Sequence, residues 1–243
     1  VLHANPFYHF QHKQQSNYMK GDLHPIFQSM RISSKYTLNY FDKIQSVNVS
    51  LERRLSSLKT LRKETMKQIE LTLNERFPDD TLIDTQHPPE DLSSRSDYWL
   101  INTLDGSDNI LFNLPLFALG AARYIDNECH TICVYDPLRD ECYSAIRGRG
   151  AFINQNRIRF SKRKTNQLIF AIETSDFPAH DYPPVYRRLG CESLSIAYCC
   201  HARLDGCIVG ANPTNQALEL LITEAGGRCQ IHNESMIVGH SDS

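Results

Sequence analysis

The sequence has no hydrophobic run long enough to cross a membrane. Its longest apolar segments, residues 114–122 and 204–209, have the length of core strands, whereas a membrane-spanning helix needs about 20 apolar residues. It also has no excess of one charge, because 26 Lys and Arg stand against 28 Asp and Glu. A general nucleic-acid binder usually carries a strong basic excess. We therefore expect a globular protein with no membrane partner and no general affinity for nucleic acid.

The cysteines include no C-x-x-C pair, and their spacing fits no zinc framework. The eight are Cys129, Cys133, Cys142, Cys191, Cys199, Cys200, Cys207 and Cys229. Several lie among aliphatic residues, where a free cysteine behaves as a small hydrophobe. This pattern predicts reduced, structural thiols and a reducing compartment such as the cytoplasm. The chain begins at Val1 instead of Met, which leaves open a removed targeting segment and an organelle matrix such as the mitochondrial one.

Hydrophobic periodicity predicts one layered α/β domain over residues 23–243, preceded by a polar arm over residues 1–22. Apolar residues recur at spacings of three and four in segments 24–47 and 51–77, and so predict a leading pair of antiparallel helices. The inward stripe of the second helix is expected to begin with Leu51 and Leu55. Strands are predicted at 81–84, 98–101, 116–123, 130–135, 142–146, 151–153, 157–160, 168–172 and 204–209, and further helices at 194–202 and 216–225.

Four segments of the chain, in a fixed order, form recognisable motifs. They are Tyr98-Trp-Leu-Ile-Asn-Thr-Leu-Asp-Gly-Ser-Asp-Asn109; Val134-Tyr-Asp-Pro-Leu-Arg-Asp-Glu-Cys-Tyr-Ser-Ala145 with Gly148-Arg-Gly-Ala-Phe-Ile-Asn154; residues 194–206; and Thr223-Glu-Ala-Gly-Gly-Arg228. Taken together, over residues 24–239, they resemble the inositol monophosphatase family. The resemblance implies the αβαβα sandwich of that family and a magnesium-dependent hydrolysis of small phosphate monoesters.

The resemblance also locates the family's metal-ligating carboxylates on this chain, and most of them are missing. A ligand glutamate falls at Thr85, and the first aspartate of the central motif falls at Asn102. A late ligand aspartate falls at Thr214, or at Asn215 if the alignment shifts by one residue. Magnesium prefers carboxylate oxygens, and Asp105 is the one clear carboxylate left at a ligand position. The resemblance therefore implies a degenerate metal site, with weak metal binding at Asp105 only.

An active enzyme with altered ligands is the alternative to this interpretation. Asp84 lies one residue from a lost ligand and is a candidate substitute. Ser107 keeps the hydroxyl of the threonine that, in the family, orients the attacking water. A substrate-contacting glutamate of the family falls at Val209, however. If the protein is active, the catalytic residues are then Asp105, Ser107 and Asp84, and they act with one magnesium ion.

Two cations suggest a binding site that has no metal. Counting back from the end of the second predicted helix places Lys59 and Arg62 at positions where the family has a threonine and an aspartate. Gly106 and Ser107 should open a short helix, and the N–H groups of a helix start favour anions. The hypothesis is a phosphate or sulfate held by Gly106, Ser107, Lys59 and Arg62 without hydrolysis. In the alternative, Lys59 and Arg62 simply point into water.

These observations favour a catalytically inactive family member that serves as a binding or structural subunit of a larger assembly. By analogy with dimeric relatives and with a bacterial relative that serves transcription, the expected partners are a protein or larger complex, a ribonucleoprotein among them, and a second copy of the chain. This interpretation needs no cofactor, whereas the alternative of a phosphatase needs magnesium. A third alternative, an RNA-binding factor, predicts an RNA affinity that falls steeply with salt.

Overall fold

The computed structural model describes residues 23–45, 49–89, 97–163, 168–175 and 185–240. The predicted polar arm over residues 1–22 lies outside the described residues. Among those that are described, no helix combines the length and apolar composition needed to cross a membrane. All eight cysteines are free thiols, as predicted, and six of them are buried.

Two long helices lead the described chain, as the periodicity predicted. Helix α2 spans Leu23–Gln45 and α3 spans Leu51–Asn74. They run antiparallel, since the Ser29 hydroxyl meets that of Thr72 at one end while the Tyr40 hydroxyl donates to the Arg54 carbonyl at the other. The side chain of Ser50 caps the start of α3 by accepting from a backbone N–H. Pro78 follows the end of α3, where a proline is expected.

The inward stripe of α3 differs from the expectation at its first two turns. Its buried residues are Leu58, Leu61, Thr65, Ile69 and Leu73. Leu51 and Leu55 are instead exposed, with relative accessibilities of 54% and 46%. Hydrophobic periodicity identifies which face of a helix is apolar, but not where along the helix the core that covers this face ends. The start of α3 therefore extends beyond the core that buries the rest of the helix.

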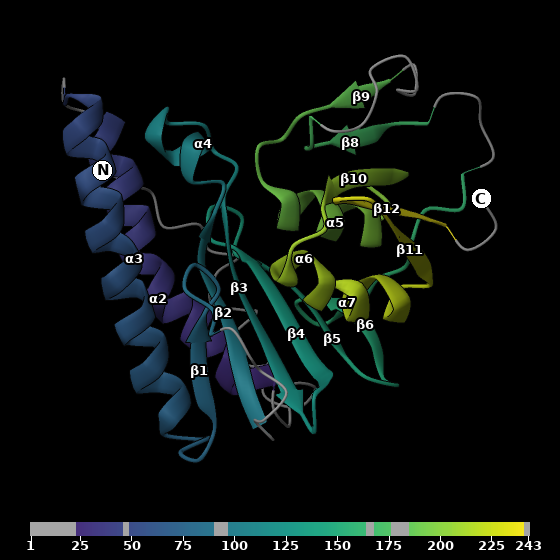
Figure 1. The fold of residues 1–243 in the computed structure, drawn as a ribbon, viewed down its shortest axis with the longest axis horizontal. Helices are drawn as coiled ribbons and strands as arrows, with labels where there is room; N and C mark the ends of the chain where they lie inside the picture. Colours follow the sequence, from purple (N-terminus) through teal and green to yellow (C-terminus); the bar gives the residue numbers. More distant parts are fainter. Residues whose placement is uncertain (1–22, 46–48, 90–96, 164–167, 176–184, 241–243) are drawn as a thin grey trace, which may run out of the picture.

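A seven-stranded sheet packs against this helix pair (Figure 1). Its strands are β1 Thr81–Asp84, β2 Asp97–Asp105, β3 Ala118–Ile125, β4 Glu128–Asp136, β5 Glu141–Ile146, β6 Gly150–Ile153 and β7 Asn156–Arg157. They are neighbours in sequence order; β1 pairs parallel with β2 and all other pairs are antiparallel. Trp99 and Ile101 of β2 are fully buried beneath α2 and α3, in one cluster with Met30 and Ile69.

The opposite face of this sheet carries a second helical layer and then a second sheet (Figure 1). The layer consists of α5 Glu192–Cys200, α6 Pro213–Ala217 and α7 Glu219–Glu224. The second sheet has the order β11-β12-β10-β8-β9, with β8 Phe170–Ile172, β9 Tyr186–Arg187, β10 Gly206–Gly210, β11 Gly227–His232 and β12 Ser235–His240. The predicted α/β layered class is confirmed. The described residues form four of the five layers of the sandwich, and no helix among them covers the outer face of the second sheet.

The helix predicted at 216–225 is two short helices, because the chain turns at Leu218. The buried side chain of Asn215 holds α6 in place, because it donates to the carbonyl of Gly210 and to the carboxylate of Glu192. Helix α7 instead buries Leu221 and Ile222 in the main core. The hydrogen bonds of Asn215 hold α6 and the core packing of Leu221 and Ile222 holds α7, so the segment predicted as one helix forms two.

Candidate functional site

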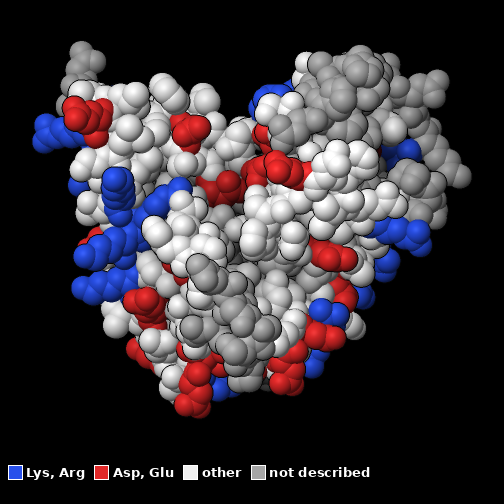
Figure 2. All heavy atoms as spheres, in the orientation of Figure 1, with Lys and Arg blue, Asp and Glu red and all other residues white. Residues whose placement is uncertain are grey.

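A polar cleft of about 360 Å³ opens where β1 and β2 end and α4 (Ser107–Leu111), α5 and α6 begin. It is lined by Arg62, Thr85, Gln86, Asn102, Leu104, Asp105, Gly106, Ser107, Glu192, Asn212, Pro213, Thr214 and Asn215. Figure 2 shows the hollow on this face of the molecule, with acidic atoms near its centre. The cleft therefore gathers residues from segments that are far apart in the sequence, and most of the residues predicted for the site are among them.

Asp105 ends β2, and both of its carboxylate oxygens already accept hydrogen bonds from the protein. Oδ1 accepts from the backbone N–H of Gly106 at 2.8 Å. Oδ2 accepts from the backbone N–H of Ser193 at 2.7 Å and from its hydroxyl at 2.6 Å. A register shift between Asn102 and Asp105 turns the end of β2 toward α5. The carboxylate therefore joins the large sheet to the first turn of α5.

The three positions predicted as lost metal ligands lie in the same cleft. Thr85 donates its backbone N–H to the carbonyl of Ile101, and its hydroxyl is buried without a hydrogen bond to any described residue. The side-chain oxygen of Asn102 accepts from the backbone of Leu104 at 3.2 Å. Thr214 lines the wall opposite, in α6. The alignment thus identified neighbours in space, and all three carry uncharged side chains.

These residues do not suit a cluster of divalent ions. Within the described ranges, no group of three or more His, Cys, Asp or Glu side chains is placed to hold a metal. Amide and hydroxyl oxygens can coordinate magnesium, but they cannot neutralise several divalent charges held close together. Oδ1 of Asp105 accepts a single hydrogen bond and keeps a lone pair, so this carboxylate can contribute one ligand but not the several that a cluster of ions needs. The donor set of the cleft is therefore a poor match for the magnesium ions on which the family's chemistry depends.

The two predicted cations of α3 lie in different places. The guanidinium of Arg62 lines the cleft, and its Nη1 is buried without a hydrogen bond to any residue described. Burial lowers the pKa of Arg62, while the charges of Asp84 and Asp105 oppose that shift. Lys59, one turn earlier, is exposed and is not among the residues that line the cleft. Asp84 accepts from the backbone of Gln86 and also lies outside the lining.

Gly106 and Ser107 lie at the start of α4, as predicted. Gly106 adopts a left-handed conformation with φ of 76°, and its N–H donates to Asp105. The helix that follows has only five residues. Ser107 lines the cleft with its hydroxyl-bearing side chain. The structure therefore brings Gly106, Ser107 and Arg62 to one cleft, and Lys59 remains outside it.

Sequence reasoning missed Glu192, the second carboxylate of the cleft. It lies in the first turn of α5, and its carboxylate accepts from the backbone of Gly210 at 2.9 Å and from the side-chain amides of Asn212 and Asn215 at 3.1 and 2.7 Å. Val209, predicted to occupy the position of a substrate-contacting glutamate of the family, is fully buried in β10. An acidic residue in the first turn of a helix is common, because it interacts favourably with the helix dipole. The presence of Glu192 in the sequence therefore did not indicate a site.

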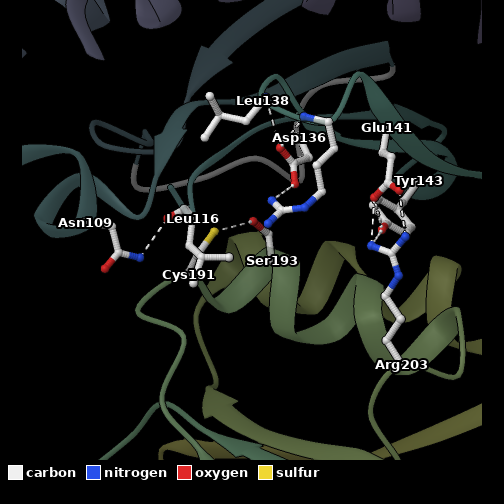
Figure 3. A network of polar contacts seen from close by, with 10 residues as sticks. Asn109, Leu116, Asp136, Leu138, Glu141, Tyr143, Cys191, Ser193 and Arg203 are labelled. Carbon is white, nitrogen blue, oxygen red and sulfur yellow. Dashed lines mark hydrogen bonds and ion pairs between the residues drawn. The ribbon is translucent and has the colours of Figure 1, made fainter. Parts of the chain in front are cut away.

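Polar contacts fix α5 against the large sheet and so position the cleft (Figure 3). At the far end of α5, Arg203 donates to the carboxylate of Glu141 at 2.8 and 2.6 Å and to the hydroxyl of Tyr143 at 2.7 Å. At the cleft end, Asn109 donates to the carbonyls of Leu116 and Leu189. Because both ends are held, Ser193 faces Asp105 in a fixed orientation.

The sequence model of the inositol monophosphatase family matches residues 40–238 of this chain. The Nus factor SuhB of Salmonella typhimurium strain LT2 is 33% identical over 64% of this chain and 64% of its own length. The Nus factor SuhB of Pasteurella multocida is 26% identical over 77% of this chain and 76% of its own. The chain thus covers less than two thirds of the length of the Salmonella protein.

Solved structures show the same fold at lower identity. The extragenic suppressor protein suhB of Bartonella henselae superposes with a TM-score of 0.73 at 22% identity, covering 90% of this chain and 93% of that one. The IMPase of Thermotoga maritima gives a TM-score of 0.74 at 21% identity, covering 89% and 91%. These likenesses establish the layered architecture on which the cleft is built.

Proposed function

The chain belongs to the inositol monophosphatase family, and from this premise we propose that it is a non-catalytic member that acts by binding. One observation carries the proposal: the cleft has neutral side chains at Thr85, Asn102 and Thr214, and the carboxylate of Asp105 is already bound by Gly106 and Ser193. A family member that has lost hydrolysis is kept for its fold, its cleft or its surface. Under this proposal the protein needs no metal cofactor.

The purified chain is expected to show no magnesium-dependent hydrolysis of inositol 1-phosphate or p-nitrophenyl phosphate. The physical reason is that one carboxylate at a predicted ligand position cannot gather the ions that activate water and stabilise the leaving group. Phosphate release is measured with magnesium and with EDTA, for the wild type and for Asp105→Asn. The proposal predicts the same background rate in all four reactions. Turnover that needs magnesium and disappears in Asp105→Asn would contradict it.

That contrary result would support the alternative, a magnesium-dependent phosphatase with altered ligands. One observation favours this alternative: Glu192 adds a second carboxylate to the cleft that holds Asp105 and Ser107. In such an enzyme Asp84 would serve as a further acid, since its charge acts on Arg62 at the cleft. Activity that is lost in Glu192→Gln but retained in Glu128→Gln, an exposed acid on β4, would establish it.

The proposed partner is a protein or a larger assembly, with a ribonucleoprotein included, in a reducing compartment. Support comes from relatives that are named Nus factors and from the small net charge of −2, which favours a protein over free nucleic acid. A homodimer is part of the proposal and is measured by light scattering on the purified chain. An RNA affinity with a steep salt dependence would instead favour direct RNA binding.

The anion-binding hypothesis is retained in a narrower form, with Arg62 and Ser107 in the cleft, because the N–H of Gly106 is already donated to Asp105 and Lys59 lies outside the lining. Isothermal titration with sulfate or inositol 1-phosphate in EDTA is expected to give weak binding, because Asp105 and Glu192 oppose an anion that Arg62 attracts. Arg62→Gln should abolish the heat of binding, while Lys59→Gln should retain it. A wild-type protein that gives no heat above buffer would end this hypothesis.

A further inference from the structure

Arg62 is the one Lys or Arg among the described residues that line the cleft. Three carboxylates surround this region: Asp105 and Glu192 line the cleft with Arg62, and the charge of Asp84 reaches it from the end of β1. The lining therefore carries one positive charge against two negative charges, and Asp84 adds a third negative charge from outside the lining. Counting back from Phe77 and Pro78, the sequence also predicts that Arg62 occupies a position where the family has an aspartate.

We propose that Arg62 is a built-in counter-ion, which takes over from the divalent cations the task of balancing the acids at this end of the sheet. This inference rests on the proposed loss of the metal. In this inference, the positive charge of the lost metal ions is replaced by a side chain of α3, which is part of the chain and need not be bound from solution. Arg62 is then a positioning residue of the cleft and takes part in no reaction.

The burial of Arg62 supports this role over that of a solvent-exposed surface cation. A guanidinium that serves only solubility keeps its nitrogens in water, as amphipathic side chains usually do. Here Nη1 is buried and makes no hydrogen bond with a described residue, so its burial carries a desolvation cost. Long-range attraction to several carboxylates in a partly buried site can offset such a cost, because charges interact there more strongly than in water.

A comparison of Lys59 with Arg62 tests this role, because the two cations lie on the same helix in different surroundings. Both lie on α3, three residues apart, and both carry one positive charge. Lys59 is exposed, whereas Arg62 is partly buried and lines the cleft together with Asp105 and Glu192. Removing the charge of Lys59 should therefore affect only screened, weak interactions. Removing the charge of Arg62 should leave three carboxylates without a cation in the cleft.

Thermal unfolding in EDTA and in millimolar magnesium chloride tests the inference on the full chain. The variants are Arg62→Met, which keeps an unbranched stem and loses the charge, Arg62→Lys, which keeps the charge, and Lys59→Met as the matched control. The wild type, Arg62→Lys and Lys59→Met are expected to melt at the same temperature with and without magnesium. Arg62→Met is expected to melt about 5 °C lower in EDTA and to recover part of that loss when magnesium is added.

The gain of magnesium dependence separates charge balance from simple packing, since a packing defect would not respond to a divalent ion. Asp84→Asn in the Arg62→Met background gives a second measurement, in which removal of the repelling charge should raise the melting temperature again. The inference is overturned if Arg62→Met is insensitive to magnesium or if the double variant melts no higher than Arg62→Met. A wild type that magnesium itself stabilises would contradict the proposed loss of the metal, a different outcome from an insensitive Arg62→Met.

Discussion

Replacing Gly106 with alanine is expected to lower the free energy of unfolding by about 4 kcal/mol. The residue has a φ of 76°, and a left-handed conformation costs a residue with a Cβ about 1–2 kcal/mol. A Cβ at this position would also lie 2.6 Å from the carbonyl oxygen of Leu116 and 3.2 Å from the Cβ of Cys191. The backbone cannot yield as a flexible side chain can, so overpacking adds about 1–3 kcal/mol.

Gly148→Ala is the matched control for this prediction. Gly148 has a nearly equal φ of 74°, but a Cβ there meets no atom within 4 Å. Its replacement should therefore cost only the conformational strain, about 1 kcal/mol. Urea unfolding of both variants measures the difference. Equal losses for the two variants would show that close packing around Gly106 contributes nothing to stability.

A packing role for Gly106 would explain why a D-G-S motif is found in a chain with neutral residues at most of the predicted metal-ligand positions. Gly106 packs the start of α4 against the segment that contains Leu116 and against Cys191 before α5. This contact is required by the fold and is independent of any reaction. Motif residues of this kind identify the family reliably, but they say little about whether the chemistry is retained.

Most of the fold could be predicted from the sequence, since it depends on local patterns. The strand at 81–84 was predicted at the bounds that the structure shows, and the second helix was predicted to start at Leu51, where α3 starts, although α3 ends three residues earlier than predicted. The prediction failed where tertiary contacts decide the outcome. The division of α6 from α7 depends on the side chain of Asn215 and its partner Glu192, and the exposure of Leu55 depends on where the core under α3 ends.

The candidate site was predicted in part, for a related reason. Alignment of motifs to a family located Asn102, Asp105 and Ser107, and these residues share the cleft. Sequence spacing could not separate Arg62 from Lys59, because the choice depends on how α3 is rotated against the sheet. Glu192 was missed, because a carboxylate that meets residues 18 to 23 positions later leaves no local pattern.

Replacing Asp105 with alanine is expected to lower the free energy of unfolding by about 3 kcal/mol, with or without magnesium. Three hydrogen bonds to an ionised carboxylate are lost, and bonds to charged groups contribute about 1.5–3 kcal/mol each. Water in the cleft can replace some of them for Gly106 and Ser193, so the expected loss is smaller than their sum. Chemical unfolding in EDTA and in magnesium measures both the size of the loss and its independence of the metal.

Asp84→Ala is the control, because Asp84 is the other acid proposed for an active site. Its carboxylate accepts one backbone hydrogen bond, from Gln86, and its side chain is a quarter exposed. We expect a loss of about 0.5–1 kcal/mol from that bond. In a metal enzyme, a ligand acid is held for catalysis, and its removal often relieves repulsion between carboxylates. A stable Asp105→Ala protein would therefore contradict the expectation that this carboxylate is a structural link between β2 and α5, and a loss of the expected size would support it.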